Sequence, residues 1–299
     1  MALDLEAREH AARRIGMPEW RDRFARGLAW LPRPRANFQL TLGLSLAAMF
    51  VILAVFAPLI SPHDPIQQYR GDELVGPSWT YWFGTDQLGR DIFSRVVFGT
   101  RASFEIGVIA VSLGASLGAA GGILAGYFQR ATEAIIMRFA EALFAFPALV
   151  LGIAFAAVFG SSSTVAAIAI GIATVPSFAR VSRASTLTVR SKDYVIAARM
   201  AGASHLKVIA RHVVPNISGP LLVQLAISMG AAVLIAAGLS FIGLGTQPPM
   251  PSWGQMLNES LRFSSQAPWY GLFPGIALTL MVLGLNSLAD GLHTKLDAR

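Results

Sequence analysis

Long, uninterrupted runs of apolar residues separated by shorter polar stretches dominate the pattern of this chain. Six such runs lie at about 39–60, 103–127, 141–160, 163–179, 216–237 and 270–290. A run of about 20 apolar residues is long enough to cross a bilayer as an α-helix. The runs lack the alternation of a strand, and lipid admits only helices or closed barrels. The pattern therefore predicts an all-α, polytopic membrane protein with six transmembrane helices.

The composition supports a membrane protein. The 299 residues are 54% hydrophobic and only 14% charged, whereas about a quarter of a soluble domain is charged. The chain has no cysteine, which excludes disulfides and thiolate chemistry. We assign the net charge of +7 to membrane topology and to attraction by membrane lipid, with no nucleic acid as a partner.

The placement of Lys and Arg predicts the orientation. Most of the 24 basic residues lie before the first run, in the second-to-third and fourth-to-fifth connections, and after the last run. Because connections rich in Lys and Arg stay in the cytoplasm, we expect both termini there. The resulting segments are a cytoplasmic tail at 1–38, a first transmembrane helix at 39–60, an outer segment at 61–102, a core of five transmembrane helices at 103–290 with a cytoplasmic loop at 184–215, and a cytoplasmic tail at 291–299.

Smaller features add local expectations. Apolar residues at 92, 93, 96 and 97 share one helical stripe, which predicts a short amphipathic helix at 90–98 lying on the membrane. Pro147 and Pro176 should kink the third and fourth spans. Trp253 and Trp269, in and after a long connection at about 238–269, suit either interface anchoring or a gating or partner role.

The second run carries a glycine at every fourth position. Glycines at this spacing lie along one ridge of a helix, where another helix can approach closely. The pattern predicts helix packing, against a neighbour in this chain or in another one. The four residues are Gly114, Gly118, Gly122 and Gly126.

The polar segment between the fourth and fifth runs predicts a helix–turn–helix. Tyr194, Ala197, Ala198 and Ala201 recur at helical spacing and make one face of mostly small side chains. Gly202 suits an unusual turn, and Pro215 stands where a helix can begin. We interpret the segment as a docking surface for a cytoplasmic partner; the alternative is an interfacial helix pair without one.

These residues also carry a family resemblance. Ala197-Ala198-x-x-x-Gly202, followed after nine residues by His212-x-Val214-Pro215, resembles the permease loop of bacterial ATP-binding-cassette importers, E-A-A-x3-G-x9-I-x-L-P. The chain departs from that motif at Ile196, His212 and Val214. Because the motif's Glu is missing, no role for it is carried over.

Further tracts resemble the dipeptide, oligopeptide and nickel permeases, most closely the "C"-type chain of each pair. They occur in order along the chain from residue 84, and the resemblance covers about residues 40–299. The tracts are Gly84-Thr85-Asp86-x-Leu88-Gly89-Arg90-Asp91-x-Phe93-Ser94-Arg95, Arg211-His212-Val213-Val214-Pro215-Asn216, Gly-Leu-Ser-Phe-Ile-Gly-Leu-Gly at 238–245, Pro-Pro-x-Pro-Ser-Trp-Gly at 248–254, and Pro268-Trp269 with Leu272-Phe273-Pro274-Gly275.

The resemblance implies a type I ABC importer permease (MetI-like) fold in the bacterial inner membrane. It implies as partners a second homologous permease chain, two ATP-binding-cassette ATPase subunits and an extracytoplasmic solute-binding protein. A 193–206 loop helix would sit in a groove of an ATPase. The implied docking residues are Tyr194, Ala197, Ala198, Arg199, Ala201, Gly202, Ala203, Leu206, His212 and Pro215.

The same resemblance implies that ATP and Mg²⁺ are used by the partner ATPases, with no cofactor bound by this chain. The chain contains no Gly-x4-Gly-Lys-Ser/Thr phosphate-binding loop. The five histidines show no metal-ligand spacing, and no catalytic grouping is expected. Peptides, glutathione or chelated nickel remain open as solutes. An ion-coupled secondary carrier is the main alternative, although the spans carry almost no central charge; a membrane-embedded hydrolase would need an acid/base or metal cluster.

Overall fold

The computed structural model describes residues 36–297 of the chain, and helices make up most of that range. Within it the one β-type pairing is an isolated bridge between Thr85 and Asp91. The helices are α3 (Ala36–Val55), α4 (Ala57–Ile60), α5 (Ile92–Phe128), α6 (Arg130–Phe144), α7 (Ala148–Phe159), α8 (Ser163–Arg190), α9 (Asp193–Met200), α10 (His205–Val208), a π-helical segment (Ile209–Val213), α11 (Val214–Phe241), α12 (Trp253–Ser260), a 3₁₀ turn (Leu261–Phe263) and α13 (Trp269–Asp297). The tail at 1–35, with its eight arginines, and residues 298–299 lie outside the described residues.

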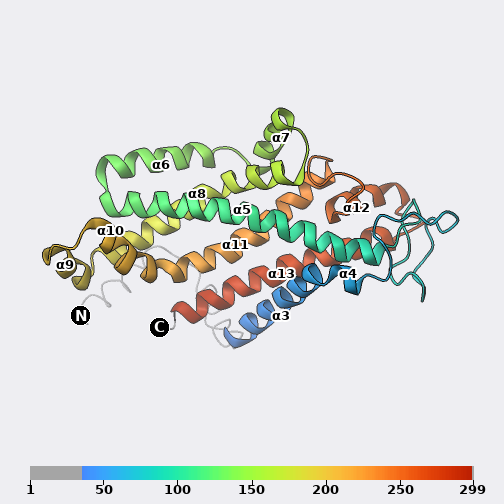
Figure 1. The fold of residues 1–299 in the computed structure, drawn as a ribbon, viewed down its shortest axis with the longest axis horizontal. Helices are drawn as coiled ribbons and strands as arrows, with labels where there is room; N and C mark the ends of the chain where they lie inside the picture. The colour runs from blue at the N-terminus through green and yellow to red at the C-terminus, as the bar shows by residue number, and fades with distance from the viewer. Residues whose placement is uncertain (1–35, 298–299) are drawn as a thin grey trace, which may run out of the picture.

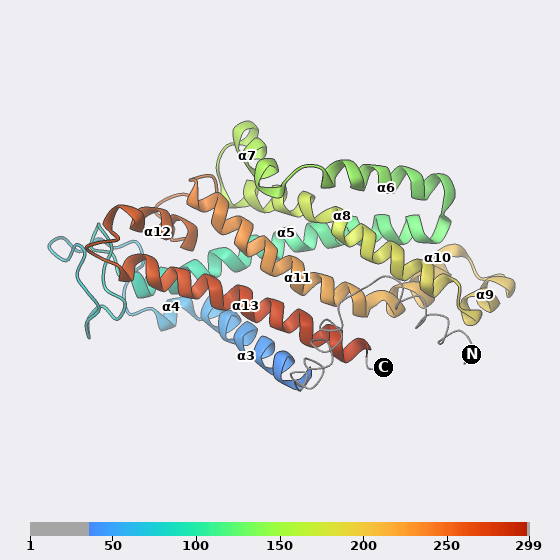
Figure 2. The same ribbon diagram turned by 180° about the vertical axis from the view of Figure 1, so that it is seen from behind.

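The long helices α3, α5, α8, α11 and α13 run lengthwise and form an elongated bundle (Figures 1 and 2). The most extensive contact joins α5 to α8, and α3 packs mainly on α13. The short helices α9 and α10 lie at one end of the bundle, which we call the α9 end. Residues 61–91 and helix α12 lie at the opposite end, which we call the α12 end.

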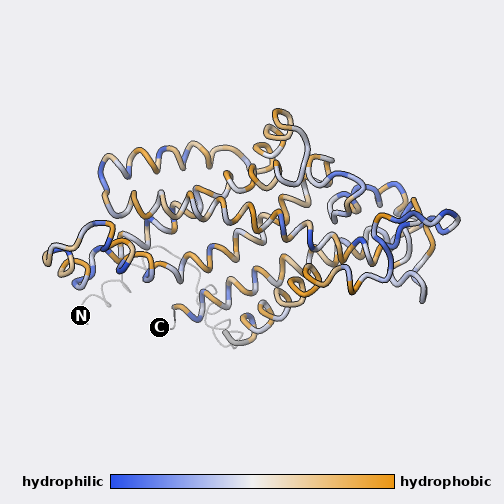
Figure 3. Tube along the Cα trace, viewed as in Figure 1, coloured by the Kyte–Doolittle hydropathy of each residue, from blue (hydrophilic) through white to orange (hydrophobic). Residues whose placement is uncertain are grey.

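Five helical segments of the described chain are long and apolar enough to cross a membrane: 38–55, 92–128, 163–190, 205–241 and 269–296. The pair α6 and α7 makes up to a sixth span, but it is bent by 83° at its break. Polar residues gather at the two ends of the bundle, and apolar residues dominate the length between them (Figure 3). The polytopic, all-helical prediction is confirmed.

The kink predicted at Pro147 in the third span at 141–160 is confirmed, and it is a complete break between two helices. Helix α6 ends at Phe144, and α7 begins at Ala148, directly after Pro147. Proline has no N–H to donate and disfavours a helical conformation at the residue before it, so the helix stops there. Apolar run length alone could not show this, because the run continues through the break. By contrast, α8 continues through Pro176.

Other boundaries also differ from the sequence pattern. The predicted separate helix at 90–98 does not exist, because α5 runs unbroken from Ile92 to Phe128. Its first turns are buried at Ile92, Val96 and Val97, so they pack inside the protein instead of lying on a membrane surface. The fourth span continues from 179 to Arg190, beyond the apolar run, because its last turns pack at the α9 end.

The glycine row on α5 faces α8 of the same chain. A Cβ atom on Gly122 would overlap the hydroxyl oxygen of Ser182 and the carbonyl oxygen of Ala179, and one on Gly118 would meet the carbonyl oxygen of Val175. Gly114 and Gly126 meet α8 in the same way. Because the side chains are absent, the two backbones come close enough for the Ser182 hydroxyl to approach the carbonyl of Gly118 at 3.4 Å.

Two groups of buried apolar residues hold the bundle together. The larger lies among α3, α5, α8, α11, α12 and α13, and includes the fully buried Ile170, Phe178 and Trp253. The smaller lies at the α9 end, where α5, α8, α9 and α11 meet. The short helices at each end of the bundle therefore pack on a separate group of buried apolar residues.

Candidate functional site

The turn after α9 is fixed by backbone hydrogen bonds. The N–H of Gly202 donates to the carbonyl of Arg199 at 3.0 Å, and the N–H of Ala203 donates to the carbonyl of Ala198 at 3.1 Å. This pair of bonds is the Schellman ending of a helix, which needs a left-handed residue at its centre. Gly202 supplies it with φ +81°. The predicted unusual turn at Gly202 is confirmed.

The expected helix at 193–206 is shorter than predicted. Helix α9 ends at Met200, a turn follows, and Ser204 caps α10 by accepting a hydrogen bond from the N–H of Lys207. Pro215 lies in the first turn of α11, as predicted, although α10, the π-helical segment and α11 follow one another without a break. In the π segment the N–H of Val214 donates five residues back, to Ile209, and the altered register accommodates the proline that follows.

The inner side of this element is anchored to the bundle. Val195 is fully buried together with Val208 and Val213, and these residues pack against Tyr127 at the end of α5. The Tyr127 hydroxyl lies 3.0 Å from Nδ1 of His205, and the Arg190 guanidinium lies over the Tyr127 ring at 6.0 Å. Tyr127 therefore joins the ends of α5 and α8 to the start of α10.

The outer side of α9 is uncovered. Tyr194, Ala197 and Ala201 are exposed, while Ala198 is half-buried. Two large apolar side chains flank this face, Met200 at 86% and Leu206 at 76% exposed. We call this surface, made of Tyr194, Ala197, Ala198, Met200, Ala201 and Leu206, the α9 face.

The remaining docking candidates lie around the α9 face. Arg199 is exposed, Gly202 is exposed in the turn, and Ala203 is half-buried behind it. The His212 ring lies 6.1 Å from the Tyr194 ring, so the structure brings these two together. Pro215 is exposed but belongs to the continuing helix.

At the α12 end, four charged side chains form a buried ionic cluster. Asp86 and Arg95 are fully buried, and Arg90 is 4% exposed. The Asp86 carboxylate accepts from Nε of Arg90 at 2.6 Å and lies 3.4 Å from Nε of Arg95. Arg90 also lies 3.4 Å from Glu259 of α12. The cluster ties residues 86–95 to α12.

Glu259 is held in its charged form. Burial raises the pKa of its carboxyl, but hydrogen bonds from the Tyr270 hydroxyl and the Gln87 amide, together with the charge of Arg90, outweigh burial and bring the pKa below its usual range. Gln255 donates a further hydrogen bond to Glu259 at 2.8 Å.

Trp253, at the start of α12, is fully buried, and its indole N–H donates to the carbonyl of Val96 at 2.9 Å. The interface-anchoring interpretation of Trp253 is wrong.

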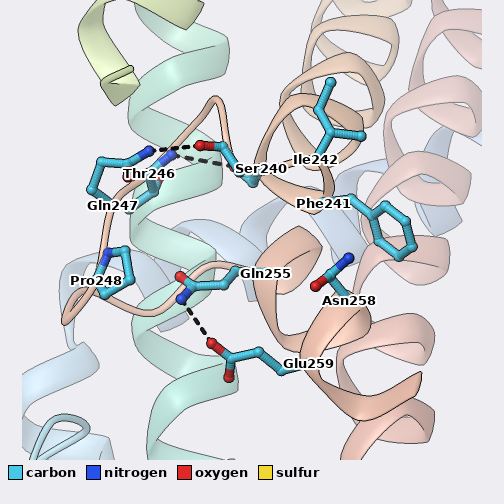
Figure 4. A pocket seen from close by; sticks show the side chains of 10 residues that line it. Ser240, Phe241, Ile242, Thr246, Gln247, Pro248, Gln255, Asn258 and Glu259 are labelled. Carbon is cyan, nitrogen blue, oxygen red and sulfur yellow. Dashed lines mark hydrogen bonds between the residues drawn. The ribbon is translucent and has the colours of Figure 1, made fainter. Parts of the chain in front are cut away.

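A polar pocket of about 390 Å³ opens beside this cluster, between the end of α11, the loop after it and α12 (Figure 4). Three carboxamides line it, from Gln247, Gln255 and Asn258. Gln255 points to Glu259, whereas Asn258 makes no drawn hydrogen bond (Figure 4). Within residues 36–297, no group of His, Asp or Glu is arranged to hold a metal ion.

Sequence reasoning missed the residues that hold both ends together. The tract Thr85–Arg95 carried a resemblance and part of a predicted amphipathic helix, but no ionic cluster was predicted there. It nevertheless places Asp86, Arg90, Asp91 and Arg95 within ten residues, shortly before an apolar run. That density of charge next to a membrane span is a signal for a buried ionic cluster. Tyr127 gave no comparable signal, because a single tyrosine near a span end suits interface anchoring equally well.

Comparisons with known proteins match most of the chain. Residues 118–299 match the family described as binding-protein-dependent transport system inner membrane component. The chain is 41% identical to the dipeptide transport system permease protein DppC of Alkalihalophilus pseudofirmus, over 86% of this chain and 84% of that protein. It is 41% identical to the glutathione transport system permease protein GsiD of Pectobacterium atrosepticum, over 85% and 86%. It is 43% identical to GsiD of Escherichia coli, over 85% of each chain.

Proposed function

The chain belongs to the family of binding-protein-dependent transport system inner membrane components, and on that basis we propose that it is the permease subunit of an ATP-driven importer of short peptides. It is a membrane transport component and not an enzyme. Transport systems of this family use an ATPase and a binding protein. Another polypeptide therefore binds Mg²⁺ and hydrolyses ATP. The peptide substrate is supported by relatives named for dipeptide and glutathione transport.

The α9 face is the observation that carries the mechanism. It is exposed, small and apolar in its centre, while its back is fixed to α5, α8 and α11 through Val195 and Tyr127. A partner that moves this face would therefore move the ends of three long helices together. We assign it as the docking site of an ATPase subunit, with Arg199, Gly202, Ala203, His212 and Pro215 around the contact.

This assignment orients the molecule. The α9 end would face the cytoplasm with both termini, and the α12 end would face the side from which a binding protein delivers its solute. The many basic residues at 180–211 support this orientation. A second homologous permease chain would complete the pathway, and two ATPase subunits would serve the pair.

The docking assignment is tested by Ala197→Asp. A carboxylate at the centre of the α9 face would be desolvated without a partner, so co-purification of the ATPase should fall at least tenfold. Ala197→Ser places a small uncharged group at the same position and serves as the matched control, which should keep the ATPase. Full retention of the ATPase by Ala197→Asp would overturn the docking role.

Transport itself is tested in proteoliposomes that contain the complete complex. Uptake of radiolabelled L-alanyl-L-alanine should require ATP and binding protein and should survive a protonophore. An ion-coupled secondary carrier would give the opposite result, with uptake abolished by the protonophore and unaffected by removal of ATP.

A further inference from the structure

Two pockets share the lining residue Thr246, at the α12 end of the bundle. The first is the pocket of Figure 4, about 390 Å³ in volume. The second is about 350 Å³ and lies between α5 and the loop before α12, where Arg101, Glu105 and Met250 line it. Thr246 lines both. The two pockets are therefore neighbours, and their lining residues extend from α5 to α12.

The second pocket holds one cation and one anion that do not neutralise each other. Arg101 and Glu105 are exposed, and neither forms an ion pair with another described residue. They stand one helical turn apart on α5, a rise of about 6 Å. Their neighbours Arg90 and Arg95, in contrast, are closed off in the buried ionic cluster.

Charges at these positions indicate water or protein, not lipid, around this part of α5. Both residues belong to a helix that is long and apolar enough to span a membrane. Ionisable side chains in such helices face a water-filled cavity or another protein, because exposure to lipid is costly. The second pocket therefore opens to water or to another protein, and not to lipid.

Thr246 supplies a polar atom without a partner at the junction of the pockets. Its side chain is 9% exposed, and its hydroxyl oxygen is buried with no hydrogen bond. Its backbone N–H is already used, donating to the Ser240 hydroxyl at 3.3 Å. The carbonyl oxygen of the Gln255 side chain is also buried and unpaired. A buried polar atom without a partner costs about 1–3 kcal/mol, so both atoms favour a hydrogen-bonding ligand.

We propose that these two pockets form a binding site for the zwitterionic backbone of a short peptide during import, an inference that rests on the proposed function. Arg101 binds the terminal carboxylate, Glu105 binds the terminal ammonium, and the Thr246 hydroxyl pairs with the peptide amide. A fully extended dipeptide spans about 7 Å, which suits two charges one helical turn apart. The pocket of Figure 4 provides room, beyond Thr246, for the side chain of a longer peptide.

The test compares charge removal in the protein with charge removal in the peptide. Uptake of L-alanyl-L-alanine is measured in proteoliposomes with complete complexes carrying Arg101→Gln, Glu105→Gln or Thr246→Val. We expect KM to rise at least tenfold for the two charge variants and about threefold for Thr246→Val, with ATPase co-purification unchanged. Arg262→Gln, another exposed arginine at this end, is the matched control and should leave KM unchanged.

Modified peptides separate binding from general damage. The C-terminal amide of the dipeptide should be a poor substrate for the wild type, and Arg101→Gln should not weaken its uptake further. The N-acetyl dipeptide should behave in the same way with Glu105→Gln. Normal KM values for the dipeptide in both charge variants would overturn the site and leave the importer intact. Absence of ATP-driven dipeptide uptake in the wild type would instead overturn the proposed function, and the site with it.

Discussion

The two ends of this molecule differ in which side chains they bury and which they expose. At the α12 end, charged groups are buried and paired with one another, as Asp86 is with Arg90 and Arg95. At the α9 end, the projecting surface is uncovered, with Met200 and Leu206 largely exposed. The buried ionic cluster contains its own partners, whereas the α9 face presents apolar area that a partner protein would bury.

The difference indicates which end depends on assembly. Removing one partner of a buried ion pair leaves an uncompensated charge, so such a change at the α12 end should destabilise the isolated chain. An exposed apolar face contributes little to the stability of the isolated chain. It contributes to the free energy of binding when a partner buries it. Variants in the buried ionic cluster should therefore change stability, and variants at the α9 end should change assembly and coupling.

The largest effect is expected from Asp86→Ala. It leaves Arg90 and Arg95 buried without their shared carboxylate and should cost about 3–5 kcal/mol. Thermal unfolding of the detergent-purified protein measures it. Arg70→Gln, an exposed site in the same segment, should change stability by about 0.5 kcal/mol or less. Equal stability of both variants would contradict a structural role for the cluster.

Gly122→Val tests the connection between the two ends. Its side chain would overlap Ser182 and Ala179 of α8 and should cost about 1–3 kcal/mol. Gly121→Ala is the control on the same helix, because its Cβ would meet only a methyl group of Ile136 at 3.4 Å. If the two variants unfold at the same temperature, the close approach of α5 and α8 is not needed for stability.

Gly202→Val tests the turn of the α9 end without adding a clash, since no atom lies within 4 Å of the position that a Cβ would take. A β-branched residue at φ +81° should strain the turn by about 1–3 kcal/mol. We expect normal bundle stability but fewer peptides imported per ATP hydrolysed. Gly202→Asn, which tolerates the left-handed conformation, should keep most of the coupling. Wild-type coupling in the valine variant would remove the turn from the mechanism.

Tyr127→Phe is the mildest change. It keeps the ring packed at the base of α9 and removes only the contact of the hydroxyl with His205, worth about 0.5–1.5 kcal/mol. We expect a small loss of coupling, read as the same uptake-to-hydrolysis ratio. In Tyr69→Phe, at the α12 end, the lost hydroxyl has no hydrogen bond to a described residue, so this control should be silent. An equal loss of coupling in both variants would contradict a specific role for the contact of Tyr127 with His205.

Much of the fold follows from the chain alone. Apolar runs of membrane-spanning length specify helices, because lipid admits only helices or closed barrels and the runs lack the alternation of a strand. The glycine spacing on α5 specifies a ridge open to close packing, and Gly202 specifies a left-handed turn, because both are properties of the local backbone. These features depend on neighbours along the sequence, so a pattern of residues is enough to find them.

Other features depend on which distant segments meet. The glycine ridge could have faced another chain, and the fold placed it on α8. Pro147 predicted a bend in the third span, but not that α6 and α7 would meet at 83°. The pairing of Asp86 with Arg95, the approach of Arg90 to Glu259, and the contact of Tyr127 with His205 join residues brought together by folding. Such contacts are absent from any local pattern, because the energy of a buried charge or ring depends on what surrounds it in space.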